Sequence, residues 1–101
     1  MNAVRLSPET QLRVDLLFLL SEREEASRLL IEECGNKLPF LEKLDEYQLE
    51  RFRFAALKLS GGSMERLRKS IAQAKTDWRD LLVAAGFGND VNIHESWLPS
   101  K

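Results

Sequence analysis

The stretch from Glu46 to Leu59, EYQLERFRFAALKL, predicts a helix with two apolar faces, and this feature decides the fold. At about 100° per residue, its apolar side chains fall on two opposite sides. One side holds Leu49, Phe52, Ala55, Ala56 and Leu59, and the other holds Tyr47, Phe54 and Leu57. Arg51 and Lys58 separate the faces on one flank, and Arg53 separates them on the other. A helix with two apolar faces must be covered from both sides, so we predict that 46–59 is the central helix.

The composition predicts one globular helical domain over residues 1–101. A chain of 101 residues is long enough for a single core, and its 44% hydrophobic and 31% charged residues exclude the disordered class. No internal repeat or strand-like alternation interrupts the helical periodicity. We therefore expect an all-α fold, a compact bundle of about five helices with short connections. Residues 89–101 are expected to form a loosely attached tail that has room for one short helix.

Capping residues bound the two helices that precede the central one. Ser7 is the expected N-cap of a helix that runs to about Leu20. A capping box that begins at Ser21 is expected to start a second helix over 22–34, which Gly35 ends. The first of these helices also carries apolar side chains on two sides. One side holds Leu12, Leu16, Leu19 and Leu20, and the other holds Val14, Leu17 and Phe18.

The central helix has capping signals of its own and a short link to its successor. Asp45 and Gln48 have the spacing of a capping box at its start. The Ser-Gly-Gly-Ser sequence at 60–63 ends the helix and opens the next one. A link of this length favours an antiparallel hairpin of helices.

The segment 63–85 allows two interpretations. Its apolar residues continue one stripe, which is typical of a single helix. Thr76 and Asp77 nevertheless offer good N-cap chemistry, so we favour a break at this point into two helices. Gly86 is the expected C-cap glycine, and Phe87 would supply the apolar contact that accompanies it.

Charge is unevenly distributed along a chain whose net charge is only -1. Residues 1–50 carry six Lys and Arg against eleven Asp and Glu, whereas 51–101 carry nine against five. The basic excess is strongest over 51–75, with seven bases and one acid. Electrostatic contacts to an anionic partner are therefore expected on the helical segment after the central helix. The candidate contact residues are Arg66, Arg68, Lys69, Lys75 and Arg79.

The side chains that enzymes use are scarce in this sequence. His94 is the only histidine and Cys34 the only cysteine, and they lie far apart in the chain, so the sequence supports no nucleophile–base pair. His94 and Glu95 begin like the metalloprotease motif HExxH, but Leu98 stands where the second histidine belongs. Cys34 is predicted to be a buried thiol, and His94 a surface or helix-end residue. We therefore expect no catalytic activity, no cofactor and no metal site.

Nothing in the sequence predicts a membrane segment. The longest apolar run, at 16–20, is far shorter than the ~20 residues that span a bilayer. The first ten residues lack the basic start and apolar middle of a signal peptide. A single cysteine fits a reducing compartment. We therefore expect a soluble cytoplasmic protein with no membrane partner.

Two functional hypotheses follow. The first is a non-catalytic protein-interaction or regulatory module, whose partner is another protein or a second copy of itself. A symmetric homodimer would bury the surplus apolar faces of 8–20 and 46–59, and a monomer whose core covers both is the alternative. The second hypothesis is a nucleic-acid-binding protein that presents 63–85 to phosphates. The acidic first half and the basic second half can also face each other, within a subunit or across an interface.

Overall fold

The described residues of the computed structural model, 6–38, 40–88 and 93–99, form only helices and their connections. Five are α-helices: α1 (Pro8–Leu17), α2 (Leu20–Ile31), α3 (Glu46–Ser60), α4 (Met64–Thr76) and α5 (Trp78–Ala84). Three are shorter: the π-helix η1 (Glu32–Asn36) and the 3-10 helices η2 (Leu41–Lys43) and η3 (Ile93–Ser96). This part of the chain contains no strand, and the predicted all-α fold is confirmed.

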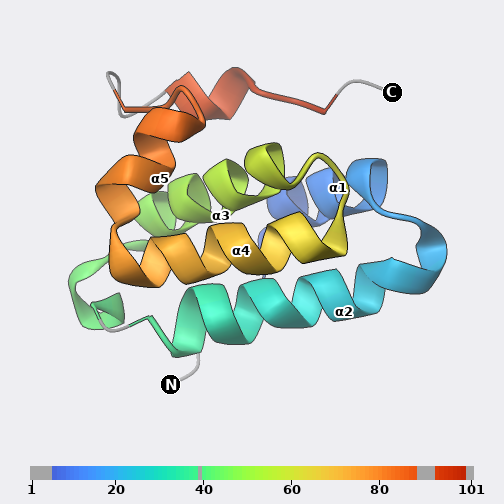
Figure 1. Cartoon of the computed structure of the whole chain (residues 1–101), viewed down its shortest axis with the longest axis horizontal. Helices are drawn as coiled ribbons and strands as arrows, with labels where there is room; N and C mark the ends of the chain where they lie inside the picture. Colours follow the sequence, from blue (N-terminus) through green and yellow to red (C-terminus); the bar gives the residue numbers. More distant parts are fainter. Residues whose placement is uncertain (1–5, 39, 89–92, 100–101) are drawn as a thin grey trace.

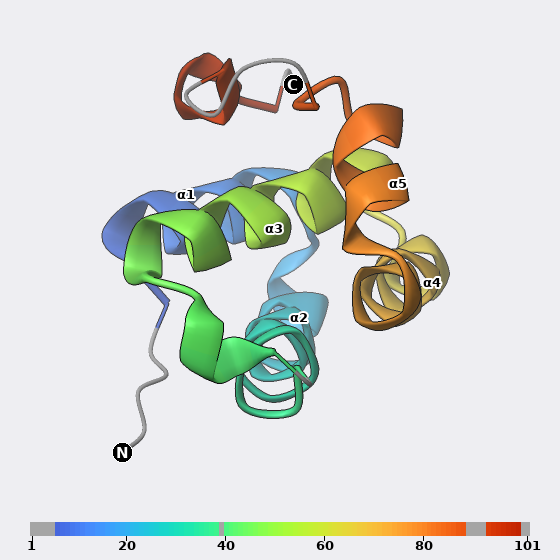
Figure 2. The same ribbon diagram turned by 90° about the vertical axis from the view of Figure 1, so that its left-hand side faces the viewer.

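The helices are arranged in two crossing layers. In Figure 1, α2 and α4 lie side by side. Figure 2 looks nearly along these two helices and shows α1 and α3 running across them. The helix η3 lies over α1 and α3, on the side away from α2 and α4. Since α3 contacts α1, α4, α5 and η3, it occupies the centre of the molecule.

Both faces of α3 are buried, as predicted. Phe54 is 1% exposed and Leu57 is 0% exposed. Phe52 on one face stacks on Trp78 of α5, with ring centroids 5.4 Å apart. Phe54 on the other face packs against His94 of η3 at 5.4 Å. One subunit therefore covers the central helix on both sides, and this helix needs no second subunit.

The predicted caps at three helix starts are confirmed. The hydroxyl of Ser7 accepts a hydrogen bond from the N–H of the third residue of α1. Asp45 and Gln48 form the reciprocal capping box of α3. The carboxylate of Asp77 accepts from the third residue of α5 and so separates this helix from α4. The favoured break in 63–85 is thus present, because a local cap satisfies the first turn of a new helix.

Glycines with positive φ end α3 and α5, as the sequence predicts. Gly61 caps α3 at a φ of 58°, and Gly62 follows at 92°. A Cβ on Gly62 would lie 2.7 Å from the carbonyl oxygen of Leu17, so the turn packs directly on the end of α1. After α5, Gly86 has a φ of 82°, and the N–H of Phe87 reaches back five residues in a Schellman motif.

The predicted junction between the first two helices is wrong. α1 ends at Leu17 instead of near residue 20, and α2 begins at Leu20 without a side-chain cap, so the capping box at Ser21 is not used. The chain is extended at Phe18, which places this ring in the core. The carbonyl of Phe18 then accepts a hydrogen bond from Nε of Arg23 at 3.1 Å. Burial of one aromatic ring therefore outweighs the local capping signal.

The prediction that Gly35 ends the second helix is also wrong. α2 continues into η1, where Gly35 is buried and lacks the positive φ of a C-cap glycine. The cause is Arg53 of α3, which was expected on a flank of its helix and is buried. Its Nε donates to the carbonyl of Leu30 at 3.1 Å and to that of Cys34 at 3.2 Å. The wider π turn leaves these carbonyls available to the arginine.

The described tail residues contact α1 and α3, while 89–92 lie outside the described residues. Buried Arg13 of α1 donates from Nε to the carbonyl of Trp97 at 3.0 Å, and its guanidinium lies 4.0 Å from the ring centroid of Phe54. Within η3, Ile93 is exposed and His94 is buried. The tight 3-10 turn of η3 directs His94 inward.

Candidate interaction surfaces

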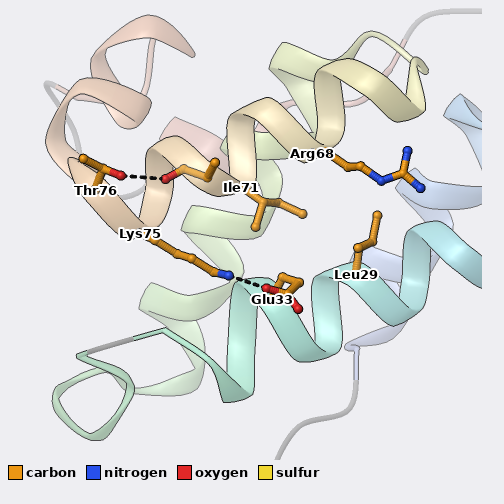
Figure 3. Close-up of a pocket in the computed structure, with 7 residues that line it drawn as sticks. Leu29, Glu33, Arg68, Ile71, Lys75 and Thr76 are labelled. Atoms are coloured by element: carbon orange, nitrogen blue, oxygen red, sulfur yellow. Dashed lines mark hydrogen bonds and ion pairs between the residues drawn. The ribbon is translucent and has the colours of Figure 1, made fainter.

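Two of the five candidate cations turn toward acidic residues, one in α2 and one in η1. Arg68 forms an ion pair with Glu25, and Lys75 forms one with Glu33. Figure 3 shows the Lys75 side chain reaching from α4 to Glu33. Here the acidic and basic halves of the chain face each other within one subunit. These two cations are therefore largely neutralised.

The other three candidate cations point elsewhere. Arg66 and Lys69 are exposed on α4, and Lys69 lies 3.6 Å from Glu65 of the same helix. Arg79 lies on α5, with its guanidinium 5.2 Å from the ring centroid of Trp78. The five cations thus occupy three separate places.

A groove of about 450 Å³ lies between α2 and α4. Leu29 of α2 and Ile71 of α4 form its apolar wall, and Figure 3 shows these side chains pointing toward the opposite helix. Arg68 lines one end and the Glu33–Lys75 pair the other. Hydrogen bonds from Lys75 and Lys37 hold the pKa of Glu33 below its usual value, so this carboxylate stays charged near neutral pH. The groove therefore has an apolar wall, and the charged residues at its two ends are paired with opposite charges.

Leu19 and Leu20, the N-cap and the first residue of α2, are 70% and 78% exposed, and we call these two consecutive residues the leucine surface. Leu12 of α1 is 47% exposed. All three residues belong to one of the two apolar sides predicted for the first helix. The other side enters the core through Val14 and Phe18. Part of the apolar surface predicted in 8–20 therefore remains exposed.

Two cavities meet at Trp78 and Arg51, which line both of them. The first, of about 310 Å³, lies beside the aromatic ring of Phe40 and also includes Lys43. The second, of about 370 Å³, includes Arg79. Trp78 is partly buried and packs against the core. The sequence signals this site only through the adjacency of Trp78 and Arg79. Arg51 lies on a different helix, so its place in the site is not visible in the sequence.

The two residues with the greatest catalytic potential, Cys34 of η1 and His94 of η3, are both buried. Burial raises the pKa of the Cys34 thiol to about 11, although Arg53 and Lys75 lower it. His94, which was expected at the surface or a helix end, lies in η3 among the rings of Tyr47 and Phe54. Residues 6–38, 40–88 and 93–99 contain no cluster of His, Cys, Asp and Glu suited to a metal ion.

Comparison with known proteins identifies no relative. No protein-family model, no curated protein and no solved structure matches this chain. In the part of the chain that the structure describes, no helix has the length and apolar character needed to cross a bilayer. Functional inference therefore rests on the surfaces themselves.

Proposed function

We propose that this protein is a non-catalytic interaction module that forms a homodimer through the leucine surface. The observation that carries the proposal is the exposure of Leu19 and Leu20, at 70% and 78%, on two consecutive residues. Single exposed leucines are ordinary on protein surfaces, but two consecutive ones form an apolar area that association would remove from water. Burying apolar surface is the main favourable contribution to protein association.

The position of Leu19 supports a role for this residue in an interface. It occupies the N-cap of α2, where it makes no capping hydrogen bond. Ser, Thr, Asp or Asn at such a position would stabilise the helix by about 1 kcal/mol relative to an apolar residue. The folded subunit gains neither a cap nor core burial from this leucine, so an apolar contact outside the subunit accounts for it.

A second copy of the chain suits this surface in both polarity and charge. A two-fold axis places the same patch of each subunit against the other, so apolar surface meets apolar surface without a different partner. Asp15 and Arg23 flank the leucines in sequence, and their charged atoms lie 4.0 Å apart. Across a two-fold axis, Asp15 of each subunit can pair with Arg23 of the other.

Sedimentation equilibrium tests the proposal. We expect the wild type to be dimeric at tens of micromolar and the double variant Leu19→Gln, Leu20→Gln to be monomeric, because each leucine is replaced by a polar side chain of similar size. The matched control is Val83→Gln, which alters a residue of α5 that is 68% exposed and should leave the dimer intact. A monomeric wild type, or a double variant that still dimerises, would contradict the proposal.

The second candidate function is nucleic-acid binding through 63–85, which the exposure of Arg66 and Lys69 favours. The pairing of Arg68 with Glu25 and of Lys75 with Glu33 leaves this segment fewer unpaired charges for phosphates than the sequence suggests. A mobility shift of duplex DNA or RNA at low salt, lost in Arg66→Gln, Lys69→Gln, would support it. We also propose a cytoplasmic location, because a buried thiol such as Cys34 fits a reducing compartment.

A further inference from the structure

The two cavities beside Trp78 have an unusual lining for a chain with more acids than bases. Three cations line them, Lys43, Arg51 and Arg79, and no carboxylate does among the described residues. The cations come from three elements, η2, α3 and α5, so only the tertiary structure brings them together. A shared pair of residues, Arg51 and Trp78, joins the cavities into one site.

Aromatic side chains give the site a fixed, flat wall. Phe52 stacks on Trp78 with an angle of 24° between the rings, and Phe40 meets Phe52 edge-on at 5.8 Å. Because Phe52 is buried in the core, it holds Trp78 in place from within. Trp78 is half buried and Phe40 is partly exposed, so both can contact a ligand.

The two arginines differ in mobility. Arg51 is fixed, because its Nη2 donates to the carbonyl of Phe87 at 2.6 Å. Arg79 is exposed, and among the described residues its guanidinium lies over the ring of Trp78. A guanidinium over an aromatic ring is attracted to it weakly at an exposed site, so Arg79 can leave the ring for a phosphate. The site therefore has one preplaced cation and one that can close on a ligand.

We propose that this site binds a nucleoside phosphate, with the base against Trp78 and the phosphate between Arg51 and Arg79. A planar ring matches the aromatic wall, and an anion matches the three cations. Inorganic phosphate would not use the aromatic wall, and an aliphatic ligand would not use the cations. Duplex nucleic acid keeps its bases stacked, so the ligand is either a free nucleotide or a single strand.

Two binding measurements at low salt distinguish these sources. Calorimetry with adenosine and uridine monophosphate reports the free nucleotide, and the anisotropy of a labelled oligothymidylate reports the single strand. We expect Trp78→Leu and Arg79→Gln each to weaken binding about tenfold, the size of one lost base stack or phosphate contact. Trp78→Phe keeps an aromatic wall and should restore most of the affinity, which separates stacking from simple misfolding.

The matched control is Arg28→Gln, which removes the same charge from an exposed arginine of α2 outside both cavities. It should change affinity less than twofold. Absence of binding by both probes would overturn the proposal, as would binding that Arg28→Gln weakens as much as Arg79→Gln, or that Trp78→Leu leaves unchanged. The double leucine variant described above should retain binding, so this result is independent of the homodimer.

Discussion

Two buried arginines tie distant segments of the chain to the core. Arg53 donates from α3 to carbonyls at the end of α2 and in η1, and Arg13 donates from α1 to the tail. Burial lowers the pKa of both guanidinium groups, because the charged form loses contact with water. Their carbonyl partners offset part of that cost. These arginines therefore connect distant segments by donating hydrogen bonds to backbone carbonyls.

The variant Arg53→Met should lower the free energy of unfolding by about 2 kcal/mol, because the carbonyls of Leu30 and Cys34 lose a buried donor. Methionine has a similar length and adds apolar contact, which limits the loss. Urea denaturation followed by circular dichroism measures the change. The control Arg66→Met, at an exposed position, should stay within about 0.5 kcal/mol of the wild type. Equal effects of the two substitutions would show that Arg53 does not support η1.

The burial of Cys34 predicts an unreactive thiol. With its pKa raised to about 11, the thiol remains protonated at pH 8, where it is also inaccessible. A disulfide reagent should therefore label native protein very slowly at pH 8 and label urea-unfolded protein rapidly. The folded state keeps the proton that the unfolded state loses above pH 9.0, so this group's contribution to stability is lost as the pH rises from 9.0 to about 11. Rapid labelling of the native protein would contradict this placement.

At the scale of helices, long-range contacts determine the ends that local signals left uncertain. α1 ends where Phe18 enters the core, and α2 widens into η1 where Arg53 reaches its carbonyls. The turn after α3 is restricted by both its backbone conformation and its neighbour. Gly61 and Gly62 both have positive φ, but only Gly62 lies against the backbone of α1.

This difference predicts unequal effects of alanine at two adjacent glycines. Gly61→Ala should cost about 1 kcal/mol, the usual penalty of a left-handed conformation, since its nearest neighbour is the mobile end of Arg66 at 4.0 Å. Gly62→Ala should cost about 3 kcal/mol, because its Cβ would also meet the carbonyl oxygen of Leu17 at 2.7 Å. Thermal or urea unfolding of the two variants measures both costs. Similar costs would mean that the turn does not pack on α1 as described.

At the scale of the whole molecule, the charge asymmetry of the sequence becomes an interface between α2 and α4. The Arg68–Glu25 pair joins α4 to α2, and the Lys75–Glu33 pair joins α4 to η1, which continues α2. Exposed pairs of this kind contribute only a few tenths of a kcal/mol each. Their main effect is to fix which faces of the two helices meet, and to reduce the charge available to an anionic partner.

The Lys75–Glu33 pair predicts a specific dependence of stability on pH. The pKa of Glu33 is lower in the folded protein than its usual 4.5, so its stabilisation is present above that pH and is lost as the pH falls through the folded value. Lys75→Met should flatten this part of the urea-stability profile, although Lys37 still donates to Glu33 at 3.0 Å. The control Lys69→Met removes a cation that pairs only along α4 and should leave the slope unchanged. Equal slopes in the wild type and Lys75→Met would contradict the assignment.

The sequence by itself determined the parts of this protein that depend on interactions over a few residues. The two apolar faces of 46–59, the caps at Ser7, Asp45 and Asp77, and the glycine at the end of α5 each follow from spacings within one or two helical turns. A helix's periodicity and its terminal hydrogen bonds are local properties, so they can be recognised without the rest of the fold.

Only the tertiary structure decided the features that join residues distant in the chain. It placed Arg53 against the carbonyls of α2 and η1, paired Arg68 with Glu25 and Lys75 with Glu33, and left the leucine surface exposed while covering α3. It also brought Arg51 beside Trp78 and Arg79, which no spacing in the sequence indicates. The physical reason is that the sequence shows which side chains seek burial or a charge partner, whereas the packing of all helices together decides which of them obtain it.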